Sequence, residues 1–324
     1  MTIDTDRFGW GTTAEEAAAG LDLRGIRAVV TGGSSGIGAE TARVLASVGA
    51  QVTLAVRNIH EGRRVADRIT AEQDGVVHVA HLDLADPSST RAFAGAWSGP
   101  LHLLINNAGV MALPQRTLNA GGHELQFATN HLGHFVLATA LHAALTTGAE
   151  DATAQRSLGG ARVVSLSSRG HLRATVDFDD IDFEHRPYDA MIAYGQSKTA
   201  NVLFAVGAAQ RWSEEGITAN AVHPGAILET NLGRHIPADL AGAIAAANKQ
   251  QYKTTAQGAA TTILVATAPT FAGVSGRYFE DCHESEVLGR ELDDLAAHPA
   301  GVAWYALDQG NADRLWDLSE QLTT

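Results

Sequence analysis

The chain has 324 residues and a formal net charge of −13, and 45% of its residues are hydrophobic while 18% are charged. This balance excludes an intrinsically disordered chain and suits one large α/β domain with additions, or two small domains. The acidic charge also argues against nucleic acid or an anionic membrane as the main partner, because both require clustered cations.

The sequence contains one cysteine, Cys282, and therefore no disulfide framework. This usage fits a cytoplasmic enzyme best, and a packed structural thiol explains Cys282 better than a nucleophile does. The N-terminus lacks the basic and apolar regions of a signal peptide, and no run of about 18 apolar residues predicts a membrane span. We therefore expect a cytoplasmic protein without a membrane span.

A leader, residues 1–25, precedes the regular part of the chain. The run Thr12-Thr13-Ala14-Glu15-Glu16 has the pattern of a capping box, and Gly20 follows as a stop signal. We expect one short helix here, lying on the single domain that spans residues 26–324.

From residue 27 onward, short apolar runs that predict strands alternate with longer stretches that predict helices. The predicted strands are 27–30, 52–56, 76–82, 101–105, 162–166 and 218–222, and the predicted helices are 36–47, 60–70, 89–97, 124–145 and 190–212. Alternation at this spacing implies parallel βαβ units, and hence an α/β fold with a doubly wound parallel sheet and helices on both faces.

Two segments interrupt this alternation. Residues 171–189 form an acidic insertion, which we expect to be a solvated loop over the sheet edge. Residues 226–253 follow the last predicted strand, at the end of the sheet where open α/β folds bind ligands. We predict that this segment covers the substrate, with an ordinary surface helix as the alternative. The C-terminal tail, residues 280–324, is expected to pack onto the sheet and shape the cleft.

A glycine-rich turn follows the first predicted strand and opens the first helix. Glycines permit a tight turn and the close approach of a diphosphate, and the helix N-terminus offers free N–H groups and a positive dipole. The expected cofactor contacts of this turn are Gly32, Ser34, Ser35, Gly36, Ile37 and Gly38. A plain strand–helix turn is the alternative, but the position at the first βα junction favours cofactor binding.

The end of the second strand bears on the choice between NAD(H) and NADP(H). An NAD site normally presents an acid here to the ribose 2′-hydroxyl, whereas this chain has Val56, Arg57 and Asn58. A guanidinium can hold a 2′-phosphate through two parallel hydrogen bonds. The sequence therefore favours NADP(H) over NAD(H), and an arginine on the solvent face of the next helix is the alternative.

Polar and small residues follow the third and fourth strands. Asp83, with Leu84 beside it, is positioned to meet an adenine edge. Asn107, Ala108 and Gly109 follow the fourth strand, and small residues there let the backbone pass close to the cofactor. These positions extend the predicted cofactor site along the carboxyl edge of the sheet.

Further side chains are candidates for the reaction itself. Asn130 lies within a predicted helix, where it is either a satisfied core amide or holds a water molecule near Lys198. Ser167 and Ser168 both end the fifth strand and could bind a substrate oxygen. Tyr194 and Lys198 are four residues apart, so they share one helix face. The ammonium is expected to lower the pKa of the phenol toward neutrality, as proton transfer requires.

No metal site is predicted from the histidine pattern. His131 and His134 are three residues apart, but neither an acid nor a third histidine accompanies them at ligand spacing.

On these motifs, the chain resembles the short-chain dehydrogenase/reductase family. The matching residues, in family order between about 26 and 230, are Thr31-Gly32-xxx-Gly36-x-Gly38, Asn106-Asn107-Ala108-Gly109, Asn130, Ser167-Ser168, Tyr194-xxx-Lys198 and Asn220-Ala-Val-His-Pro224-Gly225. Within the family, the chain resembles the retinol dehydrogenase and WW-domain oxidoreductase branch. That similarity is carried by Leu54-Ala-Val-Arg57-Asn58, Asn130-His131-Leu132-Gly133-His134-Phe135, Tyr194-Gly-Gln-Ser-Lys198, Gly276-Arg-Tyr-Phe-Glu-Asp-Cys282 and Arg314-Leu-Trp316.

The resemblance implies a catalytic tetrad of Asn130, Ser168, Tyr194 and Lys198. Ser168, the second serine of the pair, would hold the substrate oxygen, and Tyr194 would exchange the proton. Lys198 would lower the pKa of Tyr194 and bind the nicotinamide ribose, while Asn130 would anchor a proton-relay water. The helix that carries Tyr194 often forms the dimer face in this family, so a homodimer or homotetramer is possible.

The resemblance has one departure, in the loop after the sixth strand. The backbone at Pro224 and Gly225 would face the nicotinamide ring. The family usually has threonine five residues after the proline, where this chain has Glu229, and Thr230 comes one residue later. Either the loop carries an extra residue and Thr230 takes the role, or this contact to the nicotinamide carboxamide is lost.

Together these observations predict a single-domain, Rossmann-like NADP(H)-dependent oxidoreductase that interconverts an alcohol and its ketone or aldehyde. The substrate is expected to be a lipophilic small molecule. A sensor or scaffold that binds NADP(H) without turnover is the alternative, and it would be expected to lack part of the tetrad. A Rossmann-like methyltransferase would lack the Tyr-xxx-Lys pair and would require an acid after the second strand.

Overall fold

The computed structural model describes residues 5–73, 75–227, 229–235, 252–290 and 294–324. Most of the segment 226–253, predicted to cover the substrate, therefore lies outside the described residues.

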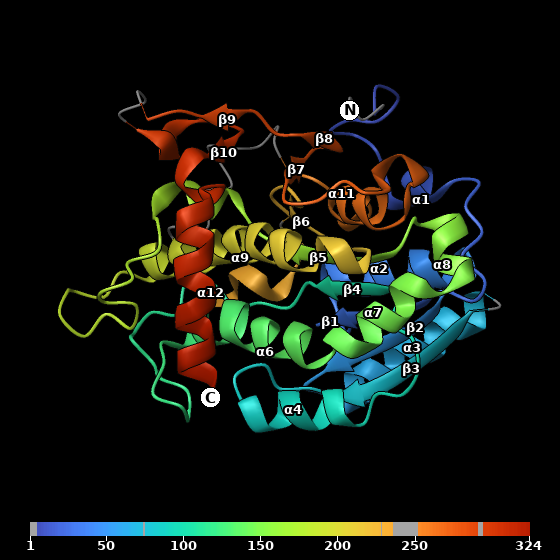
Figure 1. Ribbon diagram of the computed structural model, residues 1–324, viewed down its shortest axis with the longest axis horizontal. Coiled ribbons are helices and arrows are strands. Elements are labelled where there is room, and N and C mark those ends of the chain that lie inside the picture. Colours follow the sequence, from blue (N-terminus) through green and yellow to red (C-terminus); the bar gives the residue numbers. More distant parts are fainter. Residues whose placement is uncertain (1–4, 74, 228, 236–251, 291–293) are drawn as a thin grey trace.

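A central sheet with strand order β3-β2-β1-β4-β5-β6-β7-β8 organises the fold (Figure 1). Its strands are β1 (Arg27–Thr31), β2 (Gln51–Val56), β3 (Val76–His81), β4 (Leu103–Asn106), β5 (Ala161–Leu166), β6 (Ile217–His223), β7 (Tyr278–Glu280) and β8 (His283–Glu284). All neighbouring pairs are parallel except β7 and β8. The order reverses between β1 and β4, and open α/β sheets bind ligands at the carboxyl ends of their strands at such a point. The predicted doubly wound sheet is confirmed.

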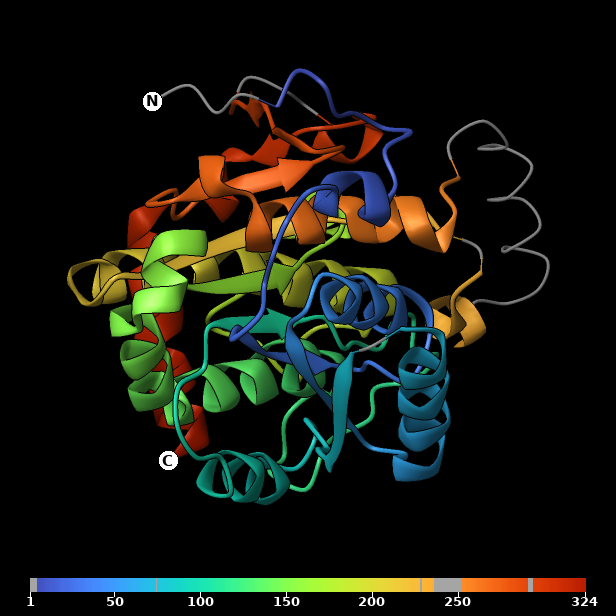
Figure 2. The ribbon, with the colours of Figure 1, turned by 90° about the vertical axis from the view of Figure 1, so that its right-hand side faces the viewer.

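Helices cover both faces of this sheet (Figure 2). They are α1 (Ala14–Ala18), α2 (Gly36–Ser47), α3 (Ile59–Glu72), α4 (Pro87–Gly95), α5 (Leu125–Phe127), α6 (Gly133–Ala140), α7 (His142–Glu150), α8 (Ala152–Ser157), α9 (Ala190–Trp212), α11 (Thr255–Thr267) and α12 (Gln309–Thr323). Successive strand residues point to opposite faces, so Val163 packs beneath α6 and α9 while Val164 packs beneath α2 and α11. The sheet thus divides the core into two apolar layers.

The predicted helix 124–145 is wrong as a single continuous element. A π-helical turn at Ala128–Leu132 separates α5 from α6, and the chain bends by 56° between α6 and α7. Such turns are frequent at functional sites, and this one contains Asn130. After the bend, Gly148 lets α7 lie on Leu101, because a Cβ at position 148 would come within 2.0 Å of the Leu101 carbonyl oxygen.

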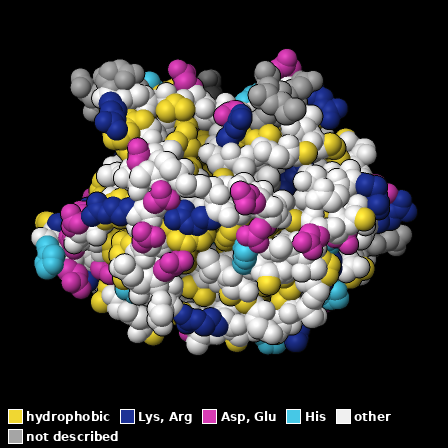
Figure 3. Space-filling model, in the orientation of Figure 1, with side chains coloured by type: hydrophobic (Ala, Val, Ile, Leu, Met, Phe, Trp, Pro, Cys, Tyr) yellow, Lys and Arg dark blue, Asp and Glu magenta, His cyan; other side chains and the backbone are white. Residues whose placement is uncertain are grey.

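Among the described helices, no single one has both the length and the apolarity of a membrane span. The bent stretch from α5 to α7 meets that test only when its two parts are taken together, and Phe135 and Leu137 within it are core residues. On the face drawn in Figure 3, acidic side chains lie between the basic ones, so the described residues form no continuous basic surface there.

The acidic insertion 171–189 is not the solvated loop that its charge predicts. Its apolar side chains Val176, Ile181 and Phe183 are buried, and Val176 and Ile181 pack with residues of α9 and α12. Burial of these apolar groups makes the insertion part of the core despite its acidity.

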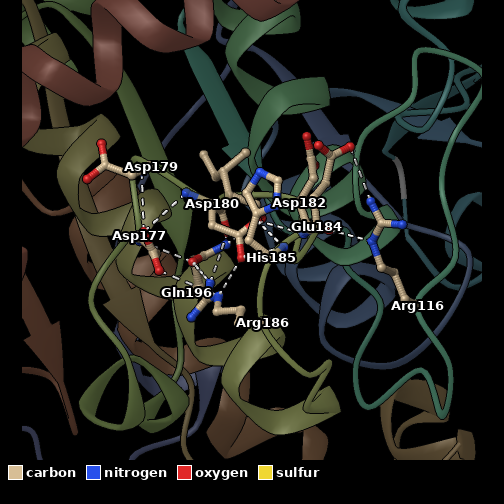
Figure 4. Close-up of polar contacts among 10 residues, drawn as sticks. Arg116, Asp177, Asp179, Asp180, Asp182, Glu184, His185, Arg186 and Gln196 are labelled. Atoms are coloured by element: carbon tan, nitrogen blue, oxygen red, sulfur yellow. Dashed lines mark hydrogen bonds and ion pairs between the residues drawn. The ribbon is translucent and has the colours of Figure 1, made fainter.

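The acidic side chains of the insertion pair with hydrogen-bond donors and basic side chains, some within the insertion and some on neighbouring segments (Figure 4). Asp180 lies 3.5 Å from Nε of Arg186. Asp182 accepts a 2.7 Å hydrogen bond from the backbone N–H of Glu124 and lies 3.1 Å from Nδ1 of His123. The hydrogen bond to Asp182 raises the pKa of His123. Local pairing of this kind explains how an acidic segment can pack against the domain.

Both ends of the chain add to the domain, and they meet where the hydroxyl of Thr5 lies 2.8 Å from Nδ1 of His283 in β8. Helix α1 has the predicted capping box, formed by Thr13 and Glu16, and it packs on α11 and α2. After β8, strands β9 (Val287–Leu288) and β10 (Val302–Ala303) form a second, two-stranded sheet, and α12 then crosses over α9 and packs on it (Figure 1). Cys282 is buried beside Thr261, which confirms a packed thiol. A homodimer or homotetramer would need a surface other than the one on α9 that α12 covers.

Candidate active site

A cleft of about 500 Å³ opens at the carboxyl edge of the sheet, at the reversal of strand order. Every residue predicted to bind the cofactor lines it: Gly32, Ser34, Ser35, Gly36, Ile37, Gly38, Arg57, Asn58, Asp83, Leu84, Asn107, Ala108, Gly109, Tyr194, Lys198, Pro224, Gly225 and Thr230. Ser168 also lines the cleft, whereas Asn130 lies behind its wall. The structure therefore brings together residues from along most of the chain.

The glycine-rich turn packs against the loop after β4, and two of its glycines leave no room there for a side chain. Gly32 has a φ of +67°, and a Cβ there would come within 3.0 Å of Ala108. A Cβ at Gly38 would come within 2.4 Å of Nδ2 of Asn107, which donates to the Thr31 carbonyl at 2.7 Å. The turn and the N-terminus of α2 line the cleft, and this arrangement fits the diphosphate of a dinucleotide.

Arg57 and Asp83 lie at the end of the cleft formed by β2 and β3. Arg57 is exposed, and in the described part of the chain no carboxylate pairs with its guanidinium. Asn58 caps α3 by accepting hydrogen bonds from the N–H groups of His60 and Glu61 at 3.1 and 3.3 Å. An unpaired arginine in this position is available to an anionic group of a ligand.

Tyr194 and Lys198 project from α9 at the other end of the cleft. Nζ of Lys198 donates to the Leu166 carbonyl at 3.0 Å and lies 5.7 Å from the centre of the Tyr194 ring. Burial raises the pKa of Tyr194 to about 12, although a hydrogen bond with Ser168 acts in the opposite direction. Burial also lowers the pKa of Lys198 to about 8. The expected lowering of the Tyr194 pKa by Lys198 is therefore wrong, because desolvation of the phenol dominates.

The two serines at the end of β5 differ in what they contact. Ser167 donates its hydroxyl to the backbone carbonyl of Lys198 at 2.8 Å. Ser168 lies close enough to the phenol of Tyr194 to act on its pKa, and its Oγ accepts from the Gly170 N–H at 3.1 Å. A Cβ at position 170 would come within 2.9 Å of the Tyr194 ring, so glycine there lets the phenol approach Ser168. Ser168 is therefore the serine beside the phenol.

Asn130 connects the loop after β4 to α9. Its Oδ1 accepts from the Val110 N–H at 2.8 Å, and its Nδ2 donates to the Val110 carbonyl and to Oγ of Ser197, each at 2.9 Å. These contacts match a satisfied core amide. A carbonyl oxygen has two lone pairs, so Oδ1 can still accept from a water molecule, and that role stays a prediction.

The loop after β6 turns Thr230, not Glu229, toward the cleft. Oε2 of Glu229 accepts hydrogen bonds from the hydroxyl and N–H of Thr255, at 2.9 and 3.2 Å, near the start of α11. A Cβ at Gly36 would come within 3.1 Å of the Thr230 methyl group. This geometry fits the alternative in which the loop carries an extra residue.

Two residues near the cleft are absent from the sequence prediction. Lys253 is buried, pairs with Asp281 at 2.6 Å, and covers Gly225, where a Cβ would come within 2.7 Å of its Cδ. His171 lies behind Ser168 and is buried. Lysine occurs only at positions 198, 249 and 253, and this scarcity is the one signal that could have identified Lys253.

The paired histidines of the Asn130 region have structural partners. Nε2 of His131 lies 2.7 Å from the hydroxyl of Ser319, and Nε2 of His134 lies 2.9 Å from the hydroxyl of Thr31. Within the described ranges, no group of three or more His, Cys, Asp or Glu side chains is arranged to hold a metal ion.

Buried histidines are expected to make the protein sensitive to acid. Burial lowers the pKa of His131 to about 3, and those of His134 and His171 to about 4. A folded-state pKa below the unfolded value means that the unfolded chain binds the proton more readily, so stability is full above about pH 6.5 and is lost as the pH falls toward about 4. Urea unfolding across this range should show a loss of about 1.4 kcal/mol per pH unit for each histidine.

Two variants separate this effect from general acid unfolding. The ring of His131 lies 5.1 Å from that of Phe127 and 6.1 Å from that of Phe135, so the core should accommodate His131→Phe. Because one buried histidine is removed, the dependence of the free energy of unfolding on pH should become shallower by about 1.4 kcal/mol per pH unit. His60 is exposed, and His60→Gln should leave the slope unchanged. Equal slopes for His131→Phe and the wild type would contradict the explanation.

Comparisons with known proteins agree with this geometry. The family model for short chain dehydrogenases matches residues 27–171. A "Probable oxidoreductase" of Streptomyces lividans is 50% identical over 304 residues, covering 92% of this chain and 97% of the relative. Retinol dehydrogenase 12 of Mus musculus is 38% identical over 306 residues, covering 93% and 87%. The predicted resemblance to the retinol dehydrogenase branch is confirmed.

Two solved structures are also similar to this chain. An uncharacterized protein from Mycobacterium paratuberculosis is 35% identical, with a TM-score of 0.71 and coverage of 97% of both chains. The RhlG/NADP active-site complex of Pseudomonas aeruginosa is 26% identical, with a TM-score of 0.62 and coverage of 80% of this chain and 96% of that one.

Proposed function

Since the chain belongs to the short-chain dehydrogenase family, we propose that it is an NADP(H)-dependent oxidoreductase that interconverts an alcohol and its ketone or aldehyde. The observation that carries the proposal is the buried phenol of Tyr194, which lies beside Ser168 and Lys198 at one end of a glycine-lined cleft. The substrate is proposed to be a lipophilic small molecule, and the cytoplasm the site of action.

Ser168 and Tyr194 would hold the substrate oxygen between their hydroxyl groups. With a pKa of about 12, the phenol is protonated at neutral pH, so it can donate a proton to the oxygen of a carbonyl compound. Lys198 would stabilise the resulting phenolate and bind the nicotinamide ribose. When bound, NADP(H) supplies or accepts the hydride at its nicotinamide ring. A protonated phenol supports carbonyl reduction as the favoured direction.

Other residues would hold the cofactor along the cleft. Asp83 would meet the adenine edge, and the backbone at Pro224 and Gly225 would face the nicotinamide ring. Thr230 would contact the carboxamide, because Glu229 is engaged by Thr255. NADP(H) rather than NAD(H) is supported by the unpaired guanidinium of Arg57 and by the similarity to a solved NADP complex.

Reversing the charge at Arg57 is expected to change the preferred cofactor. In Arg57→Asp, the 2′-phosphate of NADPH would meet a carboxylate, so the ratio of kcat/KM for NADPH to that for NADH should fall by about 10- to 100-fold or more, as expected for loss of a charge-assisted hydrogen bond. Steady-state kinetics with both cofactors measures this ratio.

Arg63→Asp is the matched control, because Arg63 is an exposed arginine of α3 outside the cleft lining. It makes the same charge change and should leave the ratio within about twofold, since exposed charges interact weakly. An unchanged ratio in Arg57→Asp would mean that Arg57 does not contact the 2′-phosphate.

The proposed activity is tested by following the consumption of NADPH with a panel of aromatic, terpenoid and long-chain ketones and aldehydes, and NADH in parallel. Turnover of a lipophilic carbonyl that is faster with NADPH supports the proposal. Tight binding of NADPH without turnover across the panel would favour a sensor or scaffold instead. The presence of all four tetrad side chains in this chain argues against that alternative.

A further inference from the structure

We propose that His171 is a positioning residue for the reaction, which fixes Ser168 beside Tyr194 and couples it to the C-terminal extension, residues 278–306. The inference rests on the proposed function, since it concerns the serine that would hold the substrate oxygen. It assigns a role in the active site to Ala303 and Tyr305, which lie more than a hundred residues after Tyr194 and Lys198 in the chain.

The hydrogen bonds of His171 define which ring nitrogen carries the proton. The imidazole is fully buried, with Nε2 at 3.2 Å from the Ala303 backbone nitrogen and Nδ1 at 2.7 Å from the Ser168 carbonyl oxygen. A backbone N–H can only donate, so Nε2 accepts, and the proton on Nδ1 is donated to Ser168. The ring therefore links β10 to the end of β5 as a neutral bridge.

The backbone of His171 extends this link to α9. Its carbonyl oxygen accepts a 2.7 Å hydrogen bond from the Tyr305 hydroxyl and a 3.2 Å hydrogen bond from the Thr199 hydroxyl. Thr199 follows Lys198 on α9, and the ring of Tyr278 packs on the imidazole with 5.0 Å between ring centres. One buried residue thus joins β7, β10, α9 and the serine.

His171 also closes the turn in which Ser168 lies. The Ser168 carbonyl accepts both from the His171 N–H at 3.0 Å and from Nδ1 of the same residue. Its hydroxyl oxygen accepts from the Gly170 N–H in the same turn. The direction of the Ser168 hydroxyl relative to the phenol is therefore set by this turn, and a displacement of about 1 Å in such a group can cost about 100-fold in rate.

Substitutions at His171 test the role of the Nδ1 donor. His171→Leu should lower kcat by about 10- to 100-fold while the Kd for NADPH changes less than twofold, because the serine is misplaced and the cofactor cleft is intact. His171→Asn presents an amide nitrogen near the position of Nδ1 and should recover most of the lost kcat. The expected split between kcat and cofactor affinity would not arise from general destabilisation.

Two further variants keep the test informative if His171→Leu folds poorly. Tyr305→Phe removes only the hydrogen bond to the His171 carbonyl and should lower kcat by about 2- to 10-fold. His102→Leu is the matched control: His102 is a buried histidine at the start of β4, accepts a backbone N–H from Arg27, and should leave kcat unchanged.

The outcomes separate this inference from the proposed function. Wild-type kcat in folded His171→Leu, or a His171→Asn variant as slow as His171→Leu, would overturn the positioning role. An unchanged kcat in Tyr305→Phe would overturn the coupling to the extension. Absence of turnover in the wild type itself would instead count against the proposed function.

Discussion

Replacing Tyr194 with phenylalanine is expected to lower kcat by about 10²- to 10⁴-fold, the contribution of a positioned proton donor. The phenol is buried, and burial raises its pKa to about 12, so it is protonated at neutral pH and no solvent group can readily take over its role. The Kd for NADPH should change little, because the ring that lines the cleft is retained. Steady-state kinetics and a fluorescence titration of NADPH on the same preparation measure the two quantities.

Tyr188→Phe provides the control for loss of a phenol elsewhere. The Tyr188 hydroxyl accepts from Nε2 of Gln126 at 2.9 Å and lies outside the cleft lining, so kcat should stay within a few-fold of wild type. Substantial turnover by Tyr194→Phe would remove Tyr194 as the proton donor.

Truncating Trp316 to alanine is expected to lower the free energy of unfolding by about 3–5 kcal/mol, as for other buried aromatic residues. Its side chain on α12 is 7% exposed, stacks on Phe204 with 6.0 Å between ring centres, and meets Phe135 and Trp212 edge-on at 5.0 and 5.6 Å. Alanine would leave a cavity between α12 and the helices that carry Asn130 and Tyr194. Urea unfolding measures the change.

Trp10→Ala is the comparison for a tryptophan that is not packed in this way. Trp10 is 42% exposed, so its truncation should change the free energy of unfolding by about 0.5 kcal/mol or less. Similar losses for the two variants would mean that α12 contributes little to the stability of the domain.

Strands β1 to β6 of the main sheet could be predicted from sequence because they alternate with helices along the chain. The short strands β7, β8, β9 and β10 could not, since a run of two or three residues carries no periodic signal. The prediction of a solvated loop at 171–189 was wrong for a different reason. Acidic residues dominate the composition of this segment, but its buried side chains Val176 and Ile181 determine where it lies. The π-helical turn at Ala128–Leu132 likewise leaves no distinct pattern in an apolar helix.

The residues of the candidate site also differ in how far they could be predicted, because some depend on local sequence and others on contacts between distant parts of the chain. Residues beside strand ends, such as Gly36 and Arg57, could be predicted because the topology gathers all carboxyl ends at one edge. The pKa of Tyr194 could not, since sequence shows that Lys198 is near but not that burial outweighs it. The role of His171 could not be predicted from sequence either, because its partners Ala303 and Tyr305 lie more than a hundred residues further along the chain.

The most direct test of the proposed chemistry follows a deuterium label from the nicotinamide ring of NADPH into the product. The wild-type protein is incubated with the labelled cofactor and the carbonyl panel, and the alcohols formed are analysed by mass spectrometry. We expect one deuterium on the carbinol carbon of at least one product, and transfer that is slower by about 100-fold or more with Tyr194→Phe. Tight binding of NADPH with no deuterium in any alcohol would contradict the assignment of this protein as an alcohol–carbonyl oxidoreductase.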